Sequence, residues 1–118
     1  MNKQALLKDI IEIKRDCYYA NWDGYSASPI SDESCNEASI FIRGLSSDLP
    51  QPEVFVDPYG TISFEWRKGK KKVFIANVAG ENKIIYMGIF GDKKIHGLEL
   101  FFRHVPIKVT NYIRRIYK

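Results

Sequence analysis

The residues of this sequence that could do acid–base chemistry are few and far apart. Asp23, in the stretch NWDGYSASPI, and Glu65, in the stretch ISFEW, are carboxylates of the kind that act as general acids, bases or metal ligands. Asp23 has no second carboxylate at a fixed spacing, so it is weak support for acid–base catalysis, and nothing in the sequence places it near Glu65. An enzyme built on a folded Asp23–Glu65 pair is therefore the weakest of three functional hypotheses.

The stretch around Asp23 has two interpretations. In the functional one, Trp22 and Tyr25 form a ligand-binding wall beside Asp23. Asp23 and Tyr25, together with Glu65 from the second stretch, are then candidates for contact with a ligand or partner. In the structural one, Trp22 packs on a sheet, Asp23 caps backbone amides and Gly24 permits a turn. Because no second catalytic group accompanies Asp23, the structural interpretation is favoured.

Cysteine and histidine do not combine into a metal-binding motif. Cys17 and Cys35 lie far apart in the sequence, as do His96 and His104, so neither pair has the short spacing typical of zinc ligands. No phosphate-binding glycine loop, serine-hydrolase elbow or metalloprotease motif is present. We expect no catalytic residues, no metal and no cofactor, and we expect buried free thiols in preference to a disulfide.

The strongest functional signal is a run of positive charge between two expected strands, RKGKKK. Its cations are Arg67, Lys68, Lys70, Lys71 and Lys72. At a hairpin tip they would form a mobile group able to contact phosphates, with Arg114 and Arg115 extending the contact. A lysine-rich tip also serves solubility alone. No aromatic residue interrupts the run, which argues against stacking of single-stranded bases there.

Charge is divided unevenly along the chain. Residues 1–60 hold 5 Lys and Arg against 10 Asp and Glu, whereas residues 61–118 hold 13 against 4, for a net charge of +4. Such an asymmetry can attract an acidic partner, either nucleic acid or an acidic protein surface. The 7 tyrosines must include exposed ones, which favour contacts with protein.

Composition is that of a globular protein. At 118 residues, with 45% hydrophobic and 27% charged residues, we predict one domain spanning residues 1–118. No apolar run approaches the roughly 18 residues of a membrane span, and charges interrupt the N-terminal stretch. We therefore expect a cytoplasmic protein that does not contact a membrane.

Apolar spacing predicts an α+β fold. One helix is expected from Asn2 to about Ala20, closed near Gly24, and a second from an N-cap at Ser31 to residues 44–48. The stretches EVFVDPYGTISFEW, KKVFIANV and NKIIYMGIF then predict an antiparallel meander of about four strands. The last two are apolar almost throughout, as is typical of central strands.

The last quarter of the chain is harder to assign. Residues 95–104 could form a strand or begin a helix. Pro106 suits the first turn of a C-terminal helix, and Ile107, Ile113 and Ile116 are expected on its buried side. We also predict that Trp22 and Trp66 belong to one hydrophobic core.

Four stretches together resemble a group of small bacterial proteins without a settled function. They are NWDGYSASPI, DLPQPEVFVDPYGTISFEW, KIHGLEL and HVPIKVTNYIRRI, and they cover about residues 20–117. Ser26 departs from the group's pattern, in which glycine is commoner. The group is associated with mobile elements and bacterial defence neighbourhoods.

The first functional hypothesis is a small non-catalytic protein that binds another protein, as an inhibitor, antitoxin or immunity-like factor of a mobile element. The alternative is a nucleic-acid-binding module that uses the basic hairpin of residues 67–72 and the C-terminal helix.

Overall fold

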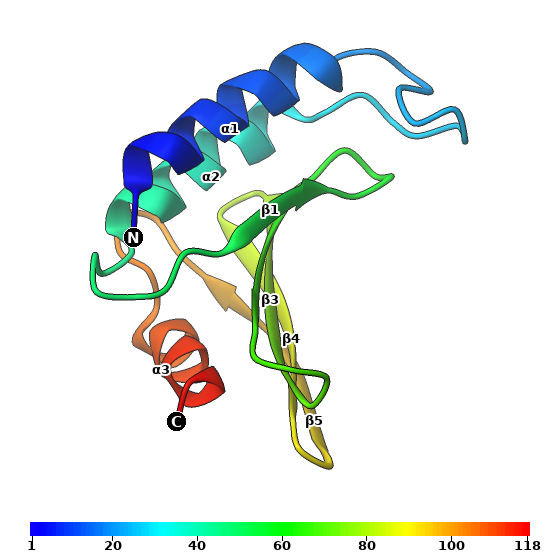
Figure 1. Ribbon diagram of the computed structural model, residues 1–118. Helices are drawn as coiled ribbons and strands as arrows, with labels where there is room; N and C mark the ends of the chain where they lie inside the picture. Colours follow the sequence, from blue (N-terminus) through cyan, green and yellow to red (C-terminus); the bar gives the residue numbers. More distant parts are fainter.

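The computed structural model describes all residues, 1–118, as three helices and a five-stranded antiparallel sheet (Figure 1). The elements are α1 (Lys3–Asp16), α2 (Asp32–Gly44), β1 (Glu53–Val56), β2 (Ile62–Arg67), β3 (Lys72–Gly80), β4 (Lys83–Phe90), β5 (Lys93–Leu100) and α3 (Ile107–Ile116). The strands follow one another across the sheet in chain order. The predicted α+β fold is confirmed, with five strands where about four were expected, because much of the unassigned stretch 95–104 lies in β5, paired with β4.

All three helices cover one face of the sheet. α2 and α3 contact β2 and β3, while α1 packs on α2 and reaches β1. Trp66 is fully buried in the shared core, where its Nε1 donates to the carbonyl of Pro50 at 2.9 Å. Trp22 packs against the same core from its edge, so the predicted sharing of one core by the two tryptophans is confirmed. None of the helices is both long enough and apolar enough to traverse a bilayer.

The first helix ends earlier than predicted. It stops at Asp16 instead of near Ala20, and Cys17 caps it by donating its N–H to the carbonyl of Ile13. The carbonyl of Cys17 then accepts from the N–H of Ile30, which commits the chain to a loop. Gly24 does adopt a φ of +78°, but within that loop and not at the end of the helix.

The second helix begins where the sequence indicated. The Ser31 side chain accepts from the N–H of Ser34 at 3.1 Å, as an N-cap does. Cys35, on the predicted apolar stripe, and Cys17 are both buried free thiols, as expected. Burial raises the pKa of both thiols, which disfavours the thiolate form.

The C-terminal helix buries two of the three isoleucines predicted for its buried side, Ile113 and Ile116. Pro106 precedes the first turn as the N-cap, and Ile107 is 78% exposed, so its assignment to the buried side was wrong. Val109, Ile113 and Ile116 form the buried side because their spacing of four and three residues follows the helical repeat.

Candidate functional site

The loop of residues 17–31 is held by its own side chains. Asp23 Oδ1 accepts from the N–H groups of Tyr25 at 2.8 Å and Ala27 at 3.1 Å. Asn21 Oδ1 accepts from the N–H of Ser26 at 2.6 Å, and Ser26 sits at a φ of +67°. The Asp23 carboxylate therefore serves to order the loop, which favours the structural interpretation of this residue.

The same loop is fixed to the turn between β1 and β2. The N–H of Ser28 donates to the Pro58 carbonyl at 2.9 Å, and the N–H of Ser31 to the Gly60 carbonyl at 2.8 Å. Gly60 has a φ of +83°, and a Cβ there would lie 2.2 Å from the carbonyl oxygen of Pro29. Only glycine fits such a close approach, so the loop and the turn pack together as one unit.

The turn between β1 and β2 is held in the same way as the loop, by an aspartate that accepts from two backbone N–H groups. The sequence patterns above did not identify this aspartate. Asp57 Oδ1 accepts from the N–H groups of Tyr59 at 2.9 Å and Thr61 at 3.1 Å. Each aspartate is followed two residues later by a tyrosine, Tyr25 or Tyr59. The repeated Asp-x-Tyr spacing was visible in the sequence and could have identified this pair of turns.

Four exposed tyrosines gather on this unit and on the chain that leads into it. Tyr25 is 88% and Tyr59 84% exposed, and Tyr18 and Tyr19 are also exposed, with their rings edge to face at 5.7 Å. We call these four residues the tyrosine end. Hydrogen bonds hold the backbone that carries Tyr25 and Tyr59.

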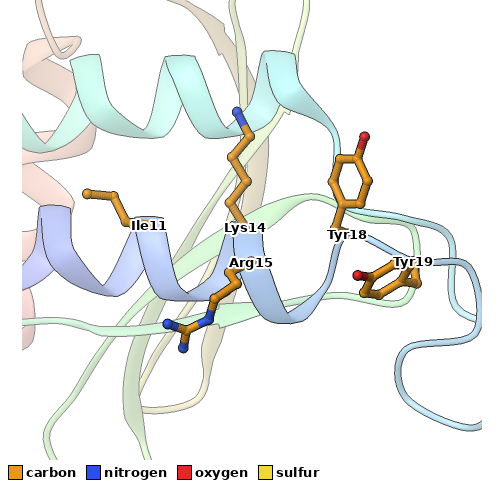
Figure 2. A pocket seen from close by; sticks show the side chains of 5 residues that line it. All are labelled: Ile11, Lys14, Arg15, Tyr18 and Tyr19. Carbon is orange, nitrogen blue, oxygen red and sulfur yellow. The ribbon is translucent and has the colours of Figure 1, made fainter.

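A shallow hollow adjoins the tyrosine end at the last turns of α1 (Figure 2). It has a volume of about 420 Å³ and is lined by Ile11, Lys14 and Arg15 together with Tyr18 and Tyr19. Ile11 is exposed, and Lys14 pairs with Asp32 at 3.3 Å, which joins α1 to the start of α2. The hollow thus adds an apolar side chain to the aromatic surface.

Glu65 lies elsewhere, on the sheet face turned away from the helices. Its Oε1 pairs with Arg67 Nη2 at 3.4 Å, and its Cα partner across the sheet is Glu53. No hydrogen bond, ion pair or pocket joins Glu65 to Asp23. The structure therefore does not assemble the two predicted candidate carboxylates into one site.

The predicted basic hairpin forms, and a second turn joins it. The N–H of Lys68 donates to the Lys72 carbonyl at 2.8 Å, and the N–H of Gly91 to the Lys71 carbonyl at 2.7 Å. The second bond holds the β4–β5 turn beside the hairpin. Five exposed lysines without ion pairs collect there, which we call the basic end: Lys68, Lys70, Lys71, Lys93 and Lys94.

The candidate arginines of this region are already engaged. Arg114 donates two hydrogen bonds to Asp48, at 2.8 and 3.3 Å, which holds the pKa of that carboxyl well below its usual range. The Arg115 guanidinium lies 4.3 Å from the centre of the Phe90 ring. Lys72 donates its Nζ to the carbonyl of Lys118. The exposed lysines, more than the arginines, are thus available to an anion.

The charge asymmetry along the chain is also an asymmetry in space. In an antiparallel meander, the β2–β3 and β4–β5 turns lie at one end of the strands, and the β1–β2 and β3–β4 turns lie at the other. The first end carries the free lysines. The second carries the tyrosines together with exposed Asp32, Glu33 and Glu81. Asp32 is paired with Lys14 and Glu81 with Lys83, whereas Glu33 has no ion-pair partner.

Comparison of the chain with protein-family models, with curated proteins and with solved structures finds no match. The tyrosine end and the basic end are therefore the features from which a function can be inferred.

Proposed function

We propose that this chain is a small non-catalytic interaction protein whose partner is another protein, bound at the tyrosine end. The observation that carries the proposal is the display of four exposed tyrosines at one end of the fold, of which Tyr25 and Tyr59 stand on turns held by hydrogen bonds. Tyrosine is enriched at protein interfaces, where its ring supplies contact area and its hydroxyl a hydrogen bond.

The loops that carry Tyr25 and Tyr59 are already ordered before a partner binds, which favours tight binding. A tyrosine loses little conformational freedom on binding because it has only two rotatable side-chain bonds. The loops that carry Tyr25 and Tyr59 are already held by Asp23 and Asp57. Less backbone entropy is then lost when a partner binds.

The surroundings of the tyrosines indicate the chemistry of the partner. At this end Asp32 pairs with Lys14 and Glu81 pairs with Lys83. Glu33, Asp23 and Asp57 have no ion-pair partner, so this end keeps an excess of negative charge and a partner surface rich in arginine or lysine is complementary to it. Cationic side chains can also stack on tyrosine faces. An inhibitor, antitoxin or immunity-like role in a mobile element, which the sequence resemblance suggests, fits a protein that acts by occupying such a surface.

A pull-down from the native host tests this function. The bait is the whole chain, with and without nuclease, and the bound proteins are quantified by mass spectrometry. We expect a protein that is retained after nuclease and lost with the Tyr25→Ser/Tyr59→Ser variant. Ile107→Ser, at another highly exposed apolar site, on α3, is the control and should retain it. A partner that both variants retain equally would contradict the proposal.

The basic end supports a second candidate function, the binding of nucleic acid. It is favoured by the hydrogen bond between Gly91 and Lys71, which brings lysines of two separate turns together. Phosphate contacts of this kind give affinity without sequence specificity. This surface lies away from the tyrosines, so the two candidate functions can be tested separately.

A further inference from the structure

The sheet face turned away from the helices is uncovered (Figure 1). Its side chains alternate with those of Phe64 and Trp66, which point into the core. The strand register arranges these side chains in rows that cross the sheet from β1 to β5. The first row is Glu53, Glu65, Ile75, Met87 and His96. The second row is Phe55, Ser63, Asn77, Ile85 and Leu98. The middle of this face is thus an apolar surface, with Met87 52% exposed.

The amide N–H groups of Asn77, in the second row, do not oppose burial of the face. The Asn77 side-chain amide lies 2.8 Å from Ser63 Oγ, 2.9 Å from Thr61 Oγ1 and 3.1 Å from Asp57 Oδ2. Its N–H groups are therefore already satisfied within the chain. Covering them removes no hydrogen bond to water that would need replacement.

The face is large enough for a specific interface. Strands about 4.8 Å apart and about 3.3 Å long per residue give a surface of roughly 20 by 25 Å, or about 500 Å² in plan. Two such faces in contact would bury on the order of 1,000 Å², the size at which specific interfaces begin. Sheets pack on one another in this way within β-sandwiches.

The two edge strands of the face carry opposite charges. Glu53 stands on β1, whereas Lys94 stands on β5. Glu65, beside Glu53 on β2, is already paired with Arg67 of the same face. A two-fold axis parallel to the strands would place each row of one copy against the same row of the second copy, with the two rows running in opposite directions across the sheet. The acidic edge of one copy would then lie over the basic edge of the other, with Ile75 and Met87 near the axis.

We infer that the uncovered face binds a second copy of this chain, sheet against sheet, about a two-fold axis parallel to the strands. The interface is isologous, so each copy contributes both an acidic and a basic edge. Because the axis preserves strand direction, the two tyrosine ends lie at the same end of the pair. The dimer would therefore present two copies of the surface that the proposed function assigns to a partner, although dimerisation does not depend on that function.

Analytical ultracentrifugation of the full chain over a wide concentration range tests the dimer. We expect a reversible monomer–dimer equilibrium whose Kd rises more than about 10-fold in Met87→Lys, because a charge would be buried at the centre of the interface. Ile107→Lys, on the helical side, is the matched control and should leave the Kd unchanged. A wild-type chain that is monomeric at every concentration, or a dimer that Met87→Lys does not weaken, overturns the inference.

Charge reversal tests the direction of the axis. Glu53→Lys and Lys94→Glu should each weaken the dimer, and the double variant should restore it. The two residues stand on opposite edges of one sheet, about 19 Å apart at about 4.8 Å per strand. An ion pair between the two residues of one copy is therefore impossible, and recovered dimer affinity in the double variant must come from a contact between copies. A double variant no tighter than either single variant overturns the proposed arrangement.

Discussion

Asp23 and Asp57 hold two adjoining turns by the same pair of hydrogen bonds. Each carboxylate accepts from the backbone N–H groups two and four residues ahead of it. Each turn carries a highly exposed tyrosine, Tyr25 or Tyr59, two residues after its aspartate. The aspartates are therefore positioning residues for the surface that we propose binds a partner.

Removal of the Asp23 carboxylate should loosen the first turn. Asp23→Ala leaves the N–H groups of Tyr25 and Ala27 without their acceptor, and we expect it to lower the free energy of unfolding by about 1–2 kcal/mol. Asp23→Asn keeps an acceptor oxygen and should lose less than half as much. Urea denaturation measures both. Equal losses in the two variants would show that the charge, and not the acceptor, stabilises the loop.

Ser26 occupies a backbone conformation that suits glycine. Its φ of +67° is in the left-handed region, which is unfavourable for a residue with a Cβ. We expect Ser26→Gly to raise the free energy of unfolding by about 0.5–1 kcal/mol, and thermal melting measures the change. Ser28→Gly, where φ is not positive, is the control and should destabilise the protein. A Ser26→Gly variant less stable than the Ser28→Gly variant would contradict the assigned loop conformation.

Glu37 should make stability depend on pH. Burial raises the pKa of this carboxyl, with Glu33 and Glu81 adding to the rise, although the N–H of Asn82 donates to its Oε1 at 2.9 Å. The folded chain therefore binds a proton more readily than the unfolded one, whose glutamate pKa is about 4.3. Stability should fall as the pH rises from about 4.3 through the folded pKa, and then level off.

Glu37→Gln isolates this effect, because glutamine can still accept from Asn82 but carries no charge. The variant should be more stable than wild type at pH 7 and lose that advantage near pH 4. Chemical denaturation at both pH values measures the difference. A variant less stable than wild type at pH 7 would mean that the ionised Glu37 is favourable in the folded state.

The basic end predicts salt-dependent binding to duplex DNA if it contacts phosphates. The logarithm of affinity should then fall with the logarithm of salt concentration, at a slope of about −0.9 per phosphate contacted. Replacing Lys68, Lys70 and Lys71 by serine should flatten the slope by up to about three units. Fluorescence anisotropy with duplex and single-stranded oligonucleotides provides the titrations.

A variant with serine at Lys8, Arg43 and Arg103 removes the same charge away from the hairpin and serves as the control. It should keep the wild-type slope. Absence of wild-type binding even at low ionic strength would exclude this second function.

Local signals in the sequence predicted local structure well. The N-cap at Ser31, the glycine-containing turns and the alternation around Trp66 depend on neighbouring residues, and the structure contains all three. The end of α1 was wrong because the bond between Ile30 and Cys17, which diverts the chain, joins residues distant in sequence.

The surfaces were less predictable because they depend on how elements pack. The apolar runs of β3 and β4 indicated central strands, which they are, but not that one face lacks a covering layer. Likewise, pairing of Arg114 with Asp48 joins the C-terminal helix to the segment before β1. Only the fold reveals which predicted cations remain free.

Binding at the tyrosine end is tested most directly by the Kd between this chain and the protein that it captures, measured by isothermal titration calorimetry. We expect the Tyr25→Ser/Tyr59→Ser variant to have a Kd at least about 100-fold higher, because tyrosines at the centre of an interface dominate binding energy. The Ile107→Ser control should bind as wild type does. A Kd within about 2-fold of wild type for the double tyrosine variant, in a chain that melts normally, would contradict the claim that the tyrosine end is the binding surface.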